Sequence, residues 1–165
     1  GTYQLYTGQS LCNDCNTGHY QNDTGQLTCI SCASGKYAQY TKSIICEYCD
    51  KGTYQPNTAQ SSCISCPTGR YENKIGSSNL ECNECNAGQY SNTEGSIICS
   101  NCSKGKMQER TGKSFCFVCA NPNWCLDSTT CIEGHKGDGC ALCTNDRFLS
   151  DQENGCEKCP KLGQR

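Results

Sequence analysis

The chain has 165 residues, 20 of which are cysteines, and its hydrophobic residues amount to 35% even when cysteine and tyrosine are counted. Such a cysteine content is typical of a disulfide scaffold, because the apolar side chains are too few to fill one globular core. The formal net charge is −2 without a basic stripe, which argues against nucleic-acid binding, and no apolar run reaches the ~20 residues of a transmembrane helix. We therefore expect an extracellular or cell-surface protein of the secretory pathway, with no membrane insertion in this segment.

A cysteine pattern with a fixed period runs through residues 1–118. Cys-x-x-Cys pairs begin at positions 12, 29, 46, 63, 82, 99 and 116, so consecutive pairs are 17 residues apart except for one step of 19. The unit reads Cys-x-x-Cys-x-x-Gly-x-Tyr, as in CISCPTGRY, and Met107 takes the tyrosine position of the last full unit. Such a period predicts a linear array of tandem repeats. Because Gly1-Thr2-Tyr3 begins in the middle of a unit, we expect the chain to be part of a longer polypeptide.

Each repeat is too short for a helix with its connections, and isolated aromatic residues among Gly, Asn, Thr and Ser predict short β-segments and turns. The Gly-x-Tyr step predicts a turn into a short strand. A second glycine, such as Gly25 or Gly95, stands four residues before the next cysteine and predicts the return turn. The predicted fold consists of small disulfide-rich repeats, with irregular β-hairpins stacked into an elongated rod and little or no helix.

The pattern changes after Cys119. Trp124, Cys125 and Cys131 break the period, and a glycine-rich segment follows from Cys131 to Cys143. We expect residues 119–159 to form a variant cysteine-rich module and residues 160–165 to begin the next segment.

The repeated motif of residues 1 to about 119 closely resembles the ephrin-receptor-like cysteine-rich tandem repeats. It is also similar to the first submodule of tumour necrosis factor receptor repeats. Residues 119–159 resemble an EGF-like or laminin-type EGF module more loosely. The resemblance implies an extracellular, rod-like, ligand-binding or structural role without catalytic chemistry.

Equivalent repeats are expected to carry equivalent disulfides, and the simplest repeating scheme joins the second cysteine of each pair to the first cysteine of the next. The resembled receptor submodule uses the same link. An EGF-like order is expected in the variant module. Cys12 and Cys159 are left for inter-segment or inter-subunit disulfides. The expected bridges are Cys15–Cys29, Cys32–Cys46, Cys49–Cys63, Cys66–Cys82, Cys85–Cys99 and Cys102–Cys116, followed by Cys119–Cys131, Cys125–Cys140 and Cys143–Cys156.

Zinc is the main alternative for the cysteines, because two neighbouring pairs have the spacing of a four-thiolate site. An unbroken series of seven pairs would leave one pair without a partner, so we favour disulfides and expect no metal. His19 and His135 stand in variable positions beside a repeat glycine, and we expect both on the surface. No catalytic set of side chains can be recognised, so we expect neither an enzyme nor a cofactor.

The glycosylation pattern N-x-[ST] occurs at Asn22 and Asn101. Asn22 lies in the polar half of its repeat and is favoured over Asn101, which stands between two cysteines that must be bridged. The repeat tyrosines have two interpretations, namely packing over the disulfides, which we favour, or an exposed aromatic ladder for a partner.

The sequence favours an extracellular structural segment of a fibre, surface coat or appendage. The alternative is a ligand-binding receptor or adhesion ectodomain. The expected partners are neighbouring repeats or copies of the same protein, an N-linked glycan and, under the alternative, a protein ligand, with no nucleic acid.

Overall fold

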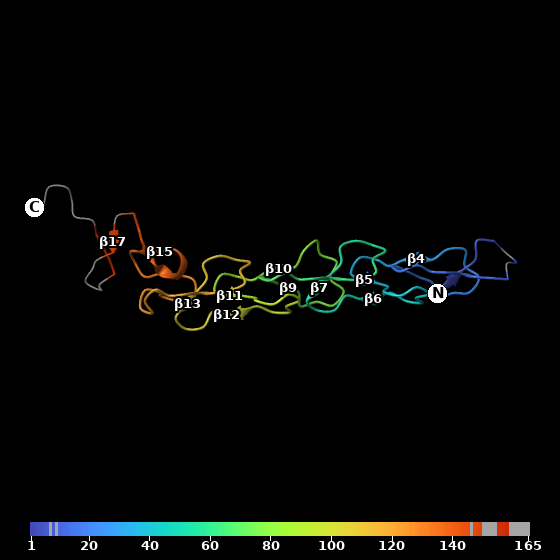
Figure 1. The fold of residues 1–165 in the computed structure, drawn as a ribbon, viewed down its shortest axis with the longest axis horizontal. Coiled ribbons are helices and arrows are strands. Elements are labelled where there is room, and N and C mark those ends of the chain that lie inside the picture. The colour runs from blue at the N-terminus through green and yellow to red at the C-terminus, as the bar shows by residue number, and fades with distance from the viewer. Residues whose placement is uncertain (7, 9, 146, 150–154, 159–165) are drawn as a thin grey trace, which may run out of the picture. The chain divides into compact units, whose positions relative to one another are not determined.

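The computed structural model describes residues 1–6, 8, 10–145, 147–149 and 155–158. In this part of the chain, short strands pair into two-stranded sheets, and the one helical element is the short 3-10 helix η1 (Asp138–Cys140). The expected fold of small disulfide-rich β-hairpin repeats with little helix is therefore confirmed (Figure 1). The pairs are β1 (Thr2–Tyr3) with β2 (Asn13–Asp14), β3 (His19–Tyr20) with β4 (Ile30–Ser31), β5 (Lys36–Tyr37) with β6 (Glu47–Tyr48), β7 (Thr53–Tyr54) with β8 (Ile64–Ser65), β9 (Arg70–Tyr71) with β10 (Asn83–Glu84), β11 (Gln89–Tyr90) with β12 (Ser100–Asn101), β13 (Lys106–Met107) with β14 (Phe117–Val118), β15 (His135–Lys136) with β16 (Leu142–Cys143), and β17 (Arg147–Leu149) with β18 (Cys156–Lys158).

The chain divides into two compact units. The first contains residues 1–83 and 93–98, and the second contains residues 84–92 together with the chain from residue 99 onward. The expected change of module between residues 118 and 119 lies inside the second unit, and this boundary stays a prediction. Residues 160–165 lie outside the described part of the chain.

Within the first unit, the hairpins are joined by a repeating set of backbone hydrogen bonds between neighbouring repeats. Gly35 N donates to Gln55 O at 2.7 Å, and Ala59 N donates to Cys32 O at 2.8 Å. The next pair of repeats has the same two bonds in the same places. Because these donors and acceptors belong to the main chain, the stacking does not depend on the variable side chains. The equivalent bonds are Gly52 N to Glu72 O and Gly76 N to Cys49 O.

The glycine of the Cys-x-x-Gly step is required by both backbone conformation and space. Gly35 has a φ of +76°, a region that residues with a Cβ rarely adopt. A Cβ at this position would also collide with the carbonyl oxygen of Gly76, which belongs to the repeat two further along the chain. Gly52 has the same relation to the carbonyl of Gly95. Three consecutive repeats therefore meet at one glycine, and this close approach fixes their stacking.

Candidate functional site

The disulfides of the regular repeats form a ladder along the chain. Six bridges join the second cysteine of one pair to the first cysteine of the next, at the same pairs that the repeating scheme predicts. The second cysteines are buried, including Cys32 and Cys49. In these repeats the bridges therefore occupy the interior that an apolar core fills elsewhere.

Two of the three bridges expected in the variant module are wrong. The structure forms Cys119–Cys125 and Cys131–Cys140 in place of the EGF-like order, while Cys143–Cys156 is the pair that was expected. Cys125 and Cys131 lie opposite each other in an isolated antiparallel β-bridge, and each is bonded to a cysteine outside that bridge.

The repeat rule itself, continued beyond Cys119, gives the observed pairing. Cys131-Ile-Glu-Gly134 followed by the strand β15 has the form Cys-x-x-Gly-x. Thr144 N donates a hydrogen bond to Gly134 O, in the same way that the second cysteine of a regular repeat donates to the glycine carbonyl of the repeat before it. The bridge closes after 9 residues in this repeat and after 14 in most regular repeats. Each bridge among the described residues thus joins consecutive cysteines, and residues 119–156, where the bridged loops are shorter, are called the contracted region below. The feature of the sequence that indicates this pairing is Gly134, three residues after Cys131.

An apolar cluster of the contracted region packs against Met107 of the last regular repeat, whose side chain is fully buried. The Met107 sulfur lies 3.4 Å from the sulfur of Cys125 and 3.1 Å from that of Cys140. Trp124 packs against the same cluster and stacks on the imidazole of His135, with ring centroids 4.3 Å apart. The expectation that His135 lies on the surface is wrong, because its side chain is buried.

A row of buried polar side chains follows the repeat tyrosine, and sequence analysis missed it. The side chain of Gln55 spans the loop of its own repeat, since its amide donates to Ser62 O at 2.8 Å and its oxygen accepts from Asn57 N at 3.1 Å. Gln21 and Gln108 make the same two bonds in their repeats. Such a side chain satisfies the loop backbone from within, because the loop has no regular hydrogen-bond ladder of its own.

Glu72 takes the glutamine position in the repeat that is two residues longer. Its carboxylate is completely buried and accepts from Ser77 Oγ at 2.7 Å, Lys74 N at 3.0 Å and Asn79 Nδ2 at 3.2 Å. Burial acts to raise the pKa of Glu72, but these hydrogen bonds outweigh it, and the pKa is lowered from its ordinary value. The longer loop therefore supplies the donors that a carboxylate needs in place of an amide.

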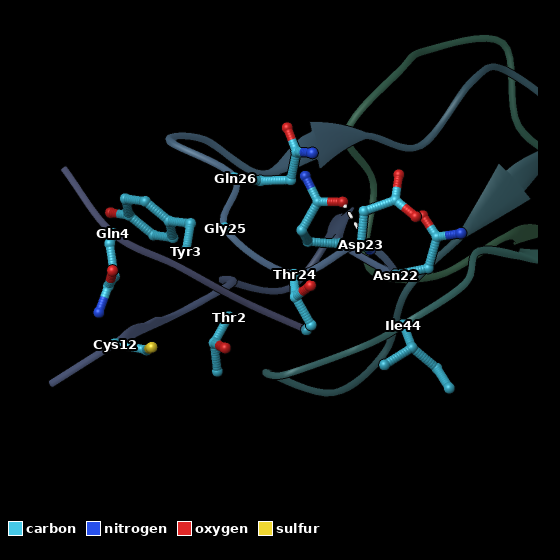
Figure 2. Close-up of a pocket in the computed structure, with 12 residues that line it drawn as sticks. Thr2, Tyr3, Gln4, Cys12, Asn22, Asp23, Thr24, Gly25, Gln26 and Ile44 are labelled. Atoms are coloured by element: carbon cyan, nitrogen blue, oxygen red, sulfur yellow. Dashed lines mark hydrogen bonds between the residues drawn. The ribbon is translucent and has the colours of Figure 1, made fainter. Parts of the chain in front are cut away.

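The two candidate glycosylation sites have different surroundings. Asn22 lies in the exposed loop after β3, and Asn101 lies in β12, where its side-chain oxygen accepts from Gln89 Nε2 at 2.9 Å. Of the two cysteines assigned to external links, Cys12 is an exposed free thiol, and Cys159 lies outside the described residues. Figure 2 shows Cys12 beside Thr2 and Gln4 at the edge of a pocket that Asn22 also lines.

Large apolar side chains are found mainly on the outside of the regular repeats. Ile44 and Ile45 are 61% and 62% exposed, and Tyr48 is 58% exposed. The repeat tyrosines, such as Tyr37 and Tyr54, are half-buried, so each ring both covers its repeat and reaches the solvent. Polar glutamines inside and aliphatic residues outside reverse the usual distribution.

No group of three or more metal-binding side chains occurs among the residues that the structure describes. Their cysteine sulfurs, Cys12 excepted, are bonded to one another, and a bonded sulfur cannot serve as a thiolate ligand. His19, expected on the surface, is half-buried in β3 with its Nδ1 3.1 Å from Thr17 O. Within the described residues, no helix is long and apolar enough to span a bilayer.

Comparison with known proteins identifies one family over the regular repeats. Residues 1–45 and 35–81 match the model of the tyrosine-protein kinase ephrin type A/B receptor-like family. No curated protein matches the chain. The matched repeats are of a non-catalytic ectodomain type, and together with the many disulfides they point to an extracellular domain. The chain is thus similar, over residues 1–81, to the ephrin-receptor-like cysteine-rich repeats.

Proposed function

We propose that the chain is a structural segment of an extracellular fibre, surface coat or appendage, in which stacked repeats set length and stiffness. The observation that carries this proposal is the set of backbone hydrogen bonds that recurs between neighbouring repeats in the same register. In such an array each repeat contacts only its near neighbours, so adding repeats extends the array and leaves its local structure unchanged.

The disulfide ladder supports a role under mechanical tension. A 17-residue repeat without its bridge would extend to roughly 60 Å under tension. With the bridge intact, the load passes through the short Cys-x-x-Cys link, roughly 10 Å when extended, and the 5.7 Å between the bridged Cα atoms. The residues inside each loop are therefore shielded from force.

Stretching single molecules of the chain tests this role. We expect each regular repeat to release less than about 20 Å when the disulfides are intact, and more than twice that length after reduction. A matched comparison uses the Cys49→Ser/Cys63→Ser double variant, which should lengthen by one unshielded loop. Equal extensions before and after reduction would contradict the proposal.

Neighbouring repeats or copies of the same protein are the proposed partners. The exposed thiol of Cys12 and the thiol of Cys159 would form the links beyond this segment. Native material run without reductant should show Cys12 in a disulfide, and the Cys12→Ser variant should lose that link while it keeps the six regular bridges. A free Cys12 in native material would contradict the assignment.

In place of an EGF-like module, we propose that residues 119–156 are a contracted continuation of the repeats. Consecutive pairing of the cysteines supports this description. Peptide mapping of the native protein that recovers a Cys119–Cys131 bridge would restore the EGF-like alternative.

A ligand-binding ectodomain is the second candidate, and the exposed apolar side chains favour it. Tyr48 lies against Gly76, and the neighbouring Ile75 is 61% exposed. The ammonium of Lys36 lies 4.2 Å from the Tyr48 ring centroid, so the aromatic face has a cation beside it. Saturable binding of the labelled chain to intact cells, lost in a Tyr48→Ser/Ile75→Ser variant and kept in the Thr53→Ser control, would favour the receptor role over the structural one.

A further inference from the structure

We propose that Asn22 carries an N-linked glycan, and that the first sugars of this glycan cover an apolar hollow beside it. The hollow has a volume of about 520 Å³, and Asn22 is one of the residues that line it. Its large apolar lining residues are Tyr20, Ile30, Ile44 and Ile45, and Ser31 and Lys36 line its polar part.

The acceptor triplet Asn22-Asp23-Thr24 is held in an exposed loop by the residue before it. Gln21 is buried, its oxygen accepts from Asp23 N at 3.1 Å, and its amide donates to Thr28 O at 2.9 Å. Asn22 is exposed, and its amide makes no hydrogen bond to another described residue. A glycan at this nitrogen would therefore displace no contact of the fold.

The second triplet is not in a loop, and its asparagine side chain is hydrogen-bonded. Asn101 is part of β12, and its side-chain oxygen accepts a hydrogen bond from Gln89 on the paired strand. The residue that follows it, Cys102, is bonded to Cys116. Formation of this hairpin and its bridge fixes the triplet in a paired strand, so we infer that Asn101 remains unmodified.

The co-reactant is an oligosaccharide joined through N-acetylglucosamine to a polyprenyl diphosphate, the donor of the secretory pathway. The side-chain nitrogen of Asn22 forms a bond to C1 of the sugar and loses one proton. The bond between C1 and the diphosphate oxygen breaks, and the polyprenyl diphosphate leaves. No oxidant or reductant takes part.

The apolar lining explains why the sugar would lie against the protein. Ile44 and Ile45 are more than half exposed, and Ile30 is 45% exposed. Contiguous apolar surface on a soluble protein usually marks a contact. The hydrogens of a pyranose ring form an apolar face that packs on aliphatic and aromatic side chains, and attachment at Asn22 places the first sugar at the rim of this hollow.

Site occupancy is tested on the chain secreted from eukaryotic cells, by peptide mass mapping before and after peptide-N-glycosidase treatment. We expect hexosamine-containing mass on the peptide of Asn22, with aspartate left at that residue by the enzyme, and an unmodified peptide at Asn101. The Thr24→Ser variant should keep the glycan, and Thr24→Val should lose it. An unmodified Asn22 peptide in the secreted wild type would overturn the proposal.

Covering of the hollow is tested with a hydrophobic fluorescent dye. Dye fluorescence should rise about two-fold in Asn22→Gln, because apolar surface becomes accessible. It should stay at the wild-type level in Asn101→Gln and return toward that level in Asn22→Gln/Ile44→Ser/Ile45→Ser. Equal dye binding by wild type and Asn22→Gln would overturn the covering role, with the mass map still reporting occupancy.

Discussion

The regular repeats, residues 15–116, and the contracted region, residues 119–156, follow one rule for their bridges and fill their interiors differently. In the regular repeats most bridges close over 14 residues, and a buried glutamine such as Gln55 supports the loop from within. In the contracted region the bridges close over 6, 9 and 13 residues, and an apolar cluster that includes Cys119, Trp124 and Cys140 packs on Met107 of the last regular repeat.

Loop length and the content of the interior change together between the two regions. A long irregular loop has backbone groups that need partners, and a polar side chain at its centre provides them. A short loop such as Cys119–Cys125 has little room for such a side chain, and its sulfurs pack on Met107 and Trp124. Substitutions of the buried side chains in each region test this comparison.

The largest effect is expected for Gly35→Ala in the regular repeats. The new Cβ would collide with the Gly76 carbonyl and would also impose the strain of φ +76°, and together these should lower the free energy of unfolding by about 4 kcal/mol. The control Gly25→Ala has a similar φ of +71° but nothing within 4 Å of its Cβ, so about 1 kcal/mol is expected. Denaturant unfolding with intact disulfides measures both. Equal losses would show that repeats do not meet closely at Gly35.

Met107→Ala, in the last regular repeat, tests the apolar cluster that the contracted region packs against this side chain. Removing this completely buried side chain leaves a cavity beside the sulfurs of Cys125 and Cys140, and a loss of about 3 kcal/mol is expected. Val118→Ala is the control, because Val118 is 70% exposed in the strand paired with β13 and should change stability by less than about 0.5 kcal/mol. A small effect of Met107→Ala would mean that the bridges alone hold this region.

Gln55→Ala removes the internal support from one regular loop. Two hydrogen bonds are lost and backbone groups of Ser62 and Asn57 lose their partners, so the free energy of unfolding should fall by about 2 kcal/mol. The exposed Gln39, changed to Ala, is the control and should have almost no effect. Faster amide hydrogen exchange at Asn57 in Gln55→Ala alone would locate the loss. Unchanged exchange there would contradict the role given to Gln55.

The sequence predicted the hairpins and the regular bridges because both follow from a period that the cysteines, Gly35 and its equivalents make visible. It did not reveal the buried row, because glutamine is usually exposed and the position also accepts Ala38 and Glu72. The pairing around Cys125 was missed because a loose EGF-like resemblance replaced the repeat rule at the point where the spacing contracts. His135 is buried in contact with Cys156 and with Trp124, and Trp124 has no counterpart in the regular repeats.

Low pH should destabilise the repeat in which Glu72 takes the glutamine position. The folded-state pKa of Glu72 is lowered below its unfolded value, so its contribution to stability is present above the unfolded pKa and is lost as the pH falls through the folded one. Denaturant midpoints of wild type and Glu72→Gln, measured at neutral pH and at successively lower pH, should therefore converge in acid. The Glu94→Gln variant, with an exposed carboxylate, serves as the control. A wild-type advantage that persists in strong acid would contradict this assignment.

The smallest expected effect is a gain in stability at the return turn. Ala59 has a φ of +57°, a conformation that costs a residue with a Cβ about 1 kcal/mol, whereas Gly25 and Gly95 have the corresponding positions in their repeats. Ala59→Gly removes that strain and keeps the hydrogen bond from its backbone N to Cys32 O, while the greater freedom of glycine in the unfolded chain opposes part of the gain. A net increase of about 0.5 kcal/mol in the free energy of unfolding is expected. Ala38→Gly is the control and should be destabilising, because Ala38 is buried and has no positive φ. If Ala59→Gly were destabilising instead, the methyl group of Ala59 would have to contribute packing between repeats that outweighs the strain of its backbone.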